Sequence, residues 1–229
     1  RDKQSIIPFI RAAQKYNPEL TFWTSPWCPP SWMKITGDYP VLSSKFNHMP
    51  EKMNYILYGN VNDKVDPDEM KLVGRRGDKF PRQLATTDYF IQDPRYLQAY
   101  ANYFCKFIDA YKEQGVNIDM VIYQNEAYSY TPYPGCAWTA EGTVRFNRDY
   151  LGPTLRQKHP EVKLYLGTFN TNRVDYVQKI ASDTKLQEYV SGMAFQWEGR
   201  ESLPVLRKEH PEWNYMCSES ECGRGSFDW

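Results

Sequence analysis

The sequence predicts an α/β protein that forms part of a (β/α)8, or TIM, barrel, and three observations support that class. Helical and strand-like patterns alternate five times along the 229 residues, without the turn signals of β-hairpins. The connections between the strands are long enough for parallel pairing. Polar or aromatic residues follow nearly every predicted strand, and a barrel collects its site from all strand ends.

An open, doubly wound sheet is the alternative that the same alternation allows. Such a sheet concentrates its site at one switch point, and a nucleotide-binding member carries a glycine-rich phosphate loop after its first strand. The first predicted strand of this chain is followed by no such loop. We therefore favour the barrel over a nucleotide-dependent α/β enzyme.

The N-terminal region is predicted to contain one helix, one strand and two loops. Apolar spacing indicates a helix over residues 6–13, and a strand-like run over 20–24 follows it. Three prolines within 25–34 favour an extended, rigid loop. Residues 36–92 have weak periodicity and are rich in Gly, Pro, Asp and Asn, so we expect a functional loop or a small excursion there.

The longest predicted helix begins at Asp93-Pro94, a capping residue followed by proline at the first helical position. Its apolar face extends to Tyr111, and Gly115 ends it. The later elements are a strand over 118–124, a helix over 143–158 interrupted at Gly152-Pro153, a strand over 163–168, a helix over 174–181, a strand over 192–197, a short helix over 202–208 and a strand over 213–218.

Five helix–strand units are too few for a closed ring. A complete (β/α)8 barrel has eight strands and needs ~250 residues without large insertions, whereas one loop here takes over fifty of the 229 residues. We therefore expect residues 1–229 to be a partial barrel domain with a long excursion at about 36–92. We also expect further strands before Arg1 and after Trp229.

Composition narrows the range of functions. The formal net charge is +0 at pH 7, which gives no electrostatic footprint for nucleic acid, and no apolar run approaches the ~20 residues of a membrane span. Five cysteines without a CxxC pair and three isolated histidines argue against a zinc site. Aromatic residues make up 16% of the chain; core packing is their ordinary use, and sugar-binding clefts use them as flat platforms.

Two carboxylates follow predicted strands. The apolar run Val121-Ile122-Tyr123 ends in Gln124-Asn125-Glu126, and its carboxylate must emerge into a cleft because burying it unpaired is too costly. Glu219 ends a later strand, with the predicted strands 163–168 and 192–197 between the two. Retaining glycoside hydrolysis uses two carboxyl groups ~5–5.5 Å apart, and strands at this separation can bring Glu126 and Glu219 face to face across a barrel mouth. A solvated cap or a salt-bridge partner is the alternative for each.

Five short segments carry a resemblance to a known family. In order, they are Ser25-Pro26-Trp27-Cys28-Pro29-Pro30-Ser31-Trp32-Met33-Lys34, Gln124-Asn125-Glu126, Leu151-Gly152-Pro153-Thr154-Leu155, Leu166-Gly167-Thr168 and Ser218-Glu219-Ser220-Glu221-Cys222-Gly223. Together they resemble glycoside hydrolase family 30, the glucosylceramidase-like retaining β-glycosidases of clan A. The resemblance runs from the helix before the third barrel strand to the end of the seventh, and the proline-rich tryptophan loop is its most discriminating part. It also implies a companion β-sandwich domain, which these residues do not include.

The resemblance implies a role for each matching residue. Glu126 would be the general acid/base and Glu219 the nucleophile. Asn125 would contact the 2-hydroxyl of the sugar, and Trp27 would line the subsite of the terminal sugar. Glu221 is the rival nucleophile because the Ser-Glu dipeptide occurs twice, but the apolar strand that leads directly into Glu219 favours that residue.

The chain departs from the family pattern after the sixth barrel strand. Better-known members have a His-Trp-Tyr-like stretch there, whereas this chain has Gln196-Trp197-Glu198. Gln196 can donate and accept a hydrogen bond but cannot titrate, so the acid/base machinery should survive while the sugar preference can differ. We expect Gln196 and Trp197 to contact the substrate.

The implied function is a retaining β-glycosidase that acts on glucose- or xylose-type linkages in plant, fungal or lipid-linked glycans. The resemblance implies a carbohydrate partner, no cofactor and no metal, and an extracellular or periplasmic location. The competing hypothesis is a non-catalytic carbohydrate-binding barrel with structural carboxylates. The presence of both Glu126 and Glu219 at matching positions argues against it.

Overall fold

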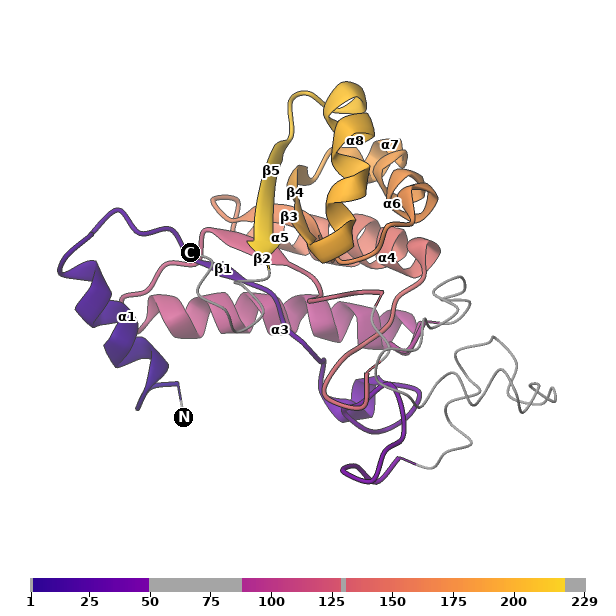
Figure 1. Cartoon of the computed structure of the whole chain (residues 1–229). Coiled ribbons are helices and arrows are strands. Elements are labelled where there is room, and N and C mark those ends of the chain that lie inside the picture. Colours follow the sequence, from indigo (N-terminus) through magenta and orange to yellow (C-terminus); the bar gives the residue numbers. More distant parts are fainter. Residues whose placement is uncertain (1, 50–87, 129–130, 221–229) are drawn as a thin grey trace, which may run out of the picture.

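The fold is an arc of five parallel strands covered by helices (Figure 1). The computed structural model describes residues 2–49, 88–128 and 131–220. The strands are β1 (Trp23–Thr24), β2 (Met120–Ile122), β3 (Lys163–Phe169), β4 (Val190–Gln196) and β5 (Asn214–Glu219). Each strand pairs in parallel with the next one along the chain, in the order β1-β2-β3-β4-β5. The predicted partial (β/α)8 barrel is therefore confirmed as five parallel strands that form half a barrel.

Helical segments connect these strands. The α-helices are α1 (Ile6–Gln14), α3 (Pro94–Lys112), α4 (Ala140–Phe146), α5 (Gly152–Lys158), α6 (Val174–Ala181), α7 (Thr184–Gln187) and α8 (Leu203–Glu209). Two short 3-10 segments, η1 (Ser31–Met33) and η4 (Trp197–Ser202), and one π-helical turn, η3 (Asn147–Leu151), complete the described elements. The predicted helices and strands occur in the predicted order, with the unpredicted helix α7 added between α6 and β4.

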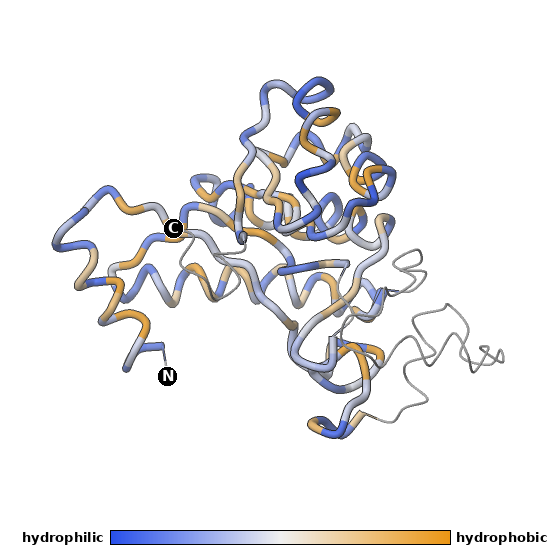
Figure 2. The backbone as a smooth tube through the Cα atoms, in the orientation of Figure 1, coloured by the Kyte–Doolittle hydropathy of each residue, from blue (hydrophilic) through white to orange (hydrophobic). Residues whose placement is uncertain are grey.

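Helix α3 forms where the sequence predicts it. The Asp93 side chain caps its first turn by accepting from the backbone N–H of Arg95 at 2.8 Å, and Pro94 occupies the first helical position. Gly115, three residues beyond the helix, has a φ of 73°, a conformation that favours glycine. Hydrophobic and hydrophilic segments alternate along this helix (Figure 2), and its apolar side is buried against the sheet.

Several predicted elements need correction, among them the strand expected over 118–124, which is limited to Met120–Ile122. Strand β1 contains two residues rather than the five expected over 20–24, because the backbone N–H of Phe22 donates to Asp119 Oδ2 at 2.6 Å rather than to a strand neighbour. Helix α7 was not expected; the Asp183 side chain starts it by accepting from the backbone N–H of Leu186 at 2.8 Å. Strand β4 ends one residue earlier than predicted, and Trp197 opens η4.

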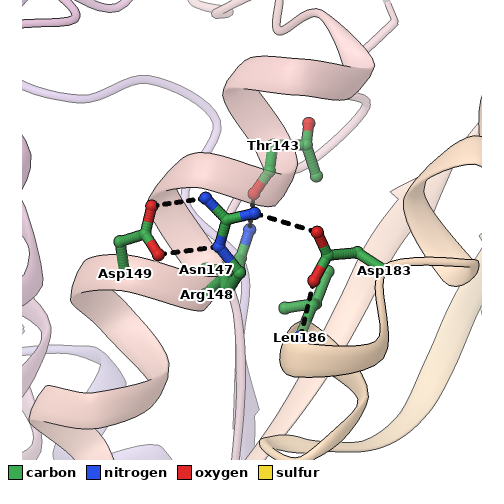
Figure 3. A network of polar contacts seen from close by, with 6 residues as sticks. All are labelled: Thr143, Asn147, Arg148, Asp149, Asp183 and Leu186. Carbon is green, nitrogen blue, oxygen red and sulfur yellow. Dashed lines mark hydrogen bonds and ion pairs between the residues drawn. The ribbon is translucent and has the colours of Figure 1, made fainter.

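The predicted interruption at Gly152-Pro153 is a change of helix type. The chain is helical from α4 through the π-turn η3 into α5, and Pro153, which has no backbone N–H to donate, lies just after the π-turn. A polar network joins this turn to the next helical layer (Figure 3). Arg148 contacts Asp149 at 2.7 Å and Asp183, at the start of α7, at 2.9 Å. This network fixes η3 against α7.

The two faces of the sheet differ. Large apolar side chains fill the side that the helices cover, and they form two extended buried clusters. The opposite side holds a small cluster of Ile122, Tyr165 and Ala194, one from each of β2, β3 and β4, with Met120 and Met216 packed against it. Because successive strand residues point to opposite faces, this small cluster marks the inner side of the barrel.

The two ends of the predicted excursion belong to the core. Val41, Leu42, Tyr89 and Phe90 are buried, and the ring of Phe90 stacks on that of Trp138 with centroids 5.0 Å apart. Of residues 36–92, those at 50–87 lie outside the described part of the chain. Within the described residues, no helix is both long and apolar enough to cross a membrane.

Candidate active site

The two candidate carboxylates lie after β2 and at the end of β5. Tyr123 and Gln124 continue β2 as buried residues, and Asn125 and Glu126 then become half-buried. Glu219 is the last residue of β5 and is exposed. The sheet order places β3 and β4 between the two strands, as the sequence predicts. Both carboxylates therefore occupy the carboxyl end of the sheet, where barrel enzymes place their chemistry.

A chain of hydrogen bonds connects the two carboxylate residues across four strands. The backbone N–H of Glu126 donates to Thr168 Oγ1 at 2.9 Å, and this hydroxyl donates to Asn125 Oδ1 at 3.3 Å. Gln196 Nε2 donates to the same Asn125 oxygen at 3.0 Å and to Glu219 Oε2 at 2.7 Å. The four side chains and the Glu126 backbone thus form a single network.

This network orients the side-chain amide of Asn125. Its Oδ1 accepts from both Thr168 and Gln196, so the NH2 group is the part of the amide that remains to donate to a ligand. The backbone N–H of Asn125 donates to the carbonyl oxygen of Pro26 at 2.8 Å, which ties the residue to the proline-rich loop. Asn125 is therefore suited to donate a hydrogen bond to a sugar hydroxyl.

The Glu126 carboxylate has a second contact, from the end of β4. Trp197 Nε1 donates to Glu126 Oε1 at 3.1 Å. Both residues have left-handed backbones, with φ values of 48° for Glu126 and 46° for Trp197. Residues other than glycine seldom adopt this region, and such strained residues gather at functional sites. The local backbone at both strand ends is thus shaped to bring these two side chains together.

Electrostatic effects also connect the carboxylates. Although Glu219 is exposed overall, protein atoms exclude part of the water from its carboxyl group and raise its pKa, and the charge of Glu126 raises this pKa further. The pKa of Tyr133 is raised first by burial and then by the charges of Glu126 and Glu219. Tyr133 therefore lies close enough to respond to both carboxylates.

Trp27 and Tyr133 form an aromatic pair beside these residues. Their ring centroids are 5.9 Å apart, and the rings are about half exposed, at 53% and 49%. The loop that carries Trp27 is held to β2, because Gln124 Nε2 donates to the Trp27 carbonyl oxygen at 2.7 Å and Trp138 Nε1 donates to Gln124 Oε1 at 3.3 Å. An exposed aromatic pair on a fixed loop is a suitable platform for a sugar ring.

A buried lysine joins the two loops that carry this aromatic pair. Lys34 is 2% exposed, and its Nζ donates to the carbonyl oxygens of Tyr39, Pro40 and Gly135 at 2.6, 2.8 and 2.8 Å. Burial lowers the pKa of the Lys34 ammonium group. Because Gly135 follows Tyr133 by two residues, these bonds fix the Tyr133 loop relative to the loop of Trp27.

A pocket of about 540 Å³ adjoins the ends of β4 and β5. Its lining includes Gln196, Trp197 and Glu219, together with the charged residues Glu198, Arg200 and Glu201. Within the described ranges, no cluster of His, Cys, Asp and Glu side chains is arranged to hold a metal ion. The described cysteines Cys28, Cys105, Cys136 and Cys217 are all unpaired.

The structure therefore brings together five of the residues singled out in the sequence. Asn125, Glu126, Gln196, Trp197 and Glu219 share direct side-chain contacts. Trp27 lies beside them: its carbonyl oxygen accepts from Gln124, which directly precedes Asn125, and its ring packs on Tyr133. Glu221, the rival nucleophile, lies outside the described residues.

Sequence reasoning assigned no role to three residues of this site. Thr168 is the polar end of a predicted strand and part of a family segment, but its contacts with Glu126 and Asn125 were not predicted. Lys34 belongs to the proline-rich segment but gives no sign of its burial in the sequence. Tyr133 lies in an irregular loop, and no periodic signal could have placed it.

The comparisons with known proteins agree with this fold. The chain matches the glycosyl hydrolase family 30 TIM-barrel domain over residues 1–46 and 89–229. Among solved structures, it resembles SrfJ from Salmonella typhimurium, with a TM-score of 0.68 at 20% identity, over 98% of this chain and 42% of that one. An endo-β1,6-glucanase structure also has a TM-score of 0.68, at 23% identity, over 97% of this chain and 42% of that one. At these identities the likeness shows the fold alone.

Curated relatives extend the match. The chain is 28% identical to the lysosomal acid glucosylceramidase of Mus musculus, over 100% of this chain and 38% of the relative. It is 26% identical to putative glucosylceramidase 1 of Caenorhabditis elegans, over 99% of this chain and 37% of that protein, and 26% identical to an endo-1,6-β-D-glucanase of Aspergillus fumigatus, over 83% and 32%. The chain thus spans less than two fifths of the length of these relatives. With the domain match covering most of its residues, the chain belongs to glycosyl hydrolase family 30.

Proposed function

We propose that the protein is a retaining β-glycosidase in which Glu219 is the nucleophile and Glu126 is the general acid/base. The observation that carries this proposal is the hydrogen-bonded network that links both carboxylate residues through Thr168, Asn125 and Gln196. Two like charges held at one strand-end cluster are costly for folding and useful for glycoside chemistry. Family membership supports the same reaction class.

The proposed reaction proceeds in two displacements. In the first, the Glu219 carboxylate attacks the anomeric carbon while the protonated carboxyl of Glu126 gives its proton to the leaving oxygen, so the glycosidic bond breaks and a glycosyl ester forms. In the second, Glu126 takes a proton from water, which attacks the anomeric carbon and releases Glu219. Asn125, oriented as a donor, would hold the hydroxyl next to the reacting carbon.

The proposed substrates are β-linked glucosyl or xylosyl glycans and glycosides, including lipid-linked ones. The relatives named above support the glucosyl class, because two are called glucosylceramidases and one an endo-1,6-β-D-glucanase. The exposed Trp27–Tyr133 pair offers a surface on which a sugar ring can stack. The aromatic platform and the two carboxylates together fit a carbohydrate better than a nucleotide or a lipid alone.

The test is hydrolysis of a panel of aryl β-glycosides and β-linked oligosaccharides by full-length protein, with the anomer first released followed by proton NMR. We expect the β-anomer to appear first. Glu219→Gln should abolish turnover, while Glu161→Gln, at the opposite end of β3, should leave it unchanged. Binding of sugars without hydrolysis would favour a non-catalytic carbohydrate-binding barrel, and an inverted product would exclude the covalent intermediate.

A further inference from the structure

Two consecutive residues at the end of β4 each donate to a different candidate carboxylate. Gln196 Nε2 donates to Glu219 Oε2 at 2.7 Å, and Trp197 Nε1 donates to Glu126 Oε1 at 3.1 Å. In a regular strand, neighbouring side chains point to opposite faces. A strand that simply continued past Gln196 would therefore turn the Trp197 indole away from the cleft.

The backbone of Trp197 removes this obstacle. Its φ of 46° ends the strand and starts η4, so the indole returns to the side that Gln196 already faces. A left-handed backbone is unfavourable for a bulky residue, and it persists only where the surrounding structure imposes it. This conformation allows the indole N–H of Trp197 to donate to Glu126.

The buried position of Gln196 also carries an energetic cost, because one of its polar atoms has no partner in the described part of the chain. The residue is 2% exposed, and its Oε1 has no hydrogen-bond partner among the described residues. Its NH2 group, in contrast, serves Asn125 and Glu219 together. The side chain is thus held for its donors rather than for its acceptor.

We propose that Gln196 and Trp197 are a pair of positioning residues that separate the work of the two carboxylates, an inference that rests on the proposed function. Gln196 holds Glu219 as an ionised nucleophile with a neutral donor. Trp197 donates to Oε1 of Glu126 and so orients this carboxyl group for proton transfer. Neither donor titrates, so the pair adds no charge beside the reacting carbon.

The first variant is Gln196→Met, which keeps the length of the side chain and removes its donors. Loss of the donor to Glu219 raises the pKa of this carboxylate, so the acidic limb of the kcat/KM profile should move up by about one pH unit. The basic limb should stay in place. Among the described residues, the other ionisable and charged groups near Glu219 are Glu126, Tyr133, Glu198, Arg200, Glu201, Tyr215 and Cys217, and this substitution leaves them intact.

The second variant is Trp197→Phe, which keeps an aromatic ring and removes the indole N–H. The Glu126 carboxyl then loses its donor while Glu219 keeps the one from Gln196, so the acidic limb, which Glu219 sets, should stay in place. With Glu126 as the proposed general acid, turnover of substrates with poor leaving groups should fall at least ~10-fold, because general acid catalysis contributes ~10²–10⁴-fold. Substrates with good leaving groups should be affected less.

Matched surface variants serve as controls. Gln178→Met removes an amide that donates to a carboxylate, Glu209 Oε1, at 3.0 Å on the protein surface. Trp32→Phe alters a 61% exposed tryptophan that packs on Tyr96. Neither control should move a limb. A purely structural role for Gln196 and Trp197 predicts a uniform loss of rate at every pH, and that result would overturn the proposal.

A measurement without turnover separates this proposal from the proposed function. The indole N–H resonance of Trp197, assigned by its absence in Trp197→Phe, should shift in Glu126→Gln and stay in place in Glu219→Gln. The carboxyl ¹³C titration of Glu219 should move to higher pH in Gln196→Met. If both signals respond as expected but the protein hydrolyses no glycoside, the proposed function is wrong and the two positioning contacts are nevertheless supported. If turnover is present and neither signal responds, the positioning pair is rejected.

Discussion

Two polar networks of this protein contain carboxylates and treat them in opposite ways. In the helical layer, Arg148 lies between Asp149 and Asp183, so each carboxylate faces a permanent positive charge (Figure 3). At the strand ends, Glu126 and Glu219 receive bonds from the neutral side chains of Trp197 and Gln196. The first network neutralises charge, and the second keeps two like charges close.

The pKa values show what this difference means. The hydrogen bond from Arg148 lowers the pKa of Asp149, so ionisation of this residue favours the folded state. Partial burial and the charge of Glu126 raise the pKa of Glu219, so ionisation of this residue opposes folding. In the second network, both carboxylates receive bonds from neutral donors at the strand ends, where the proposed reaction would use them. The comparison predicts that substitutions in the two networks have opposite effects on rate and stability.

The largest effect is expected for Glu219→Gln. Loss of the nucleophile should lower kcat by roughly 10⁴-fold or more. The free energy of unfolding at pH 7 should be unchanged or increased. With the folded pKa of Glu219 raised, its stabilising contribution is present at low pH and is lost as pH rises through that pKa, and a neutral amide avoids this loss. Turnover assays measure the change in kcat, and urea unfolding measures the change in the free energy of unfolding. A marked loss of stability in Glu219→Gln would contradict the contrast between the two networks.

The next prediction concerns the coupling of the two carboxylates. Glu126→Gln removes the like charge that contributes to the raised pKa of Glu219, so this pKa should fall, while the larger rise that partial burial causes should remain. With an activated aryl glycoside, which needs little acid catalysis, the acidic limb of the pH–rate profile should move to lower pH. An acidic limb that stays where it is in the wild type would show that the two groups do not interact.

A smaller effect is expected in the helical layer. Arg148→Met leaves Asp183 half-buried without its partner, and the free energy of unfolding at pH 7 should fall by about 1 kcal/mol. Because the pKa of Asp149 is lowered, the stability that it contributes is present above about pH 4 and is lost as pH falls through its folded pKa. The difference from wild type should therefore shrink in acid. Turnover should not change. Arg95→Met, which breaks the exposed ion pair between Arg95 and Asp93, serves as the control.

The smallest effect is a dependence on salt. Raising NaCl to about 1 M shortens the screening length to about 3 Å and weakens exposed ion pairs. The stability difference between wild type and Arg148→Met should then decrease by a few tenths of a kcal/mol. The pH profile of turnover should respond less, because Gln196 and Trp197 are neutral donors. Equal responses would remove the distinction between the networks.

Much of the fold could be predicted because its signals are local. Asp93-Pro94 starts a helix and Gly115 ends it through well-understood backbone preferences, and the structure contains both. The carboxyl ends of parallel strands share one edge, so placing Glu126 and Glu219 near each other followed from the order of elements alone. Gly152-Pro153 signalled an interruption, but the choice of a π-turn depends on packing that periodicity does not report.

The finer geometry of the site could not be predicted for a physical reason. The alternation of side chains in a strand predicts that Gln196 and Trp197 face opposite ways, and only the left-handed backbone at Trp197 reverses this. Lys34 and Tyr133 depend on how two irregular loops pack together. Such contacts join residues about one hundred positions apart, and no local pattern in the sequence specifies them.

The most direct test of the account is to trap the glycosyl-enzyme. A 2-deoxy-2-fluoro β-glucosyl fluoride should label the protein once, and tryptic digestion should place the label in the peptide Glu209–Arg224. Fragmentation should then locate the sugar on Glu219, and Glu219→Gln should remain unlabelled. A label on Glu221, or turnover with inversion and no label at all, would contradict the assignment of Glu219 as the nucleophile of a retaining reaction.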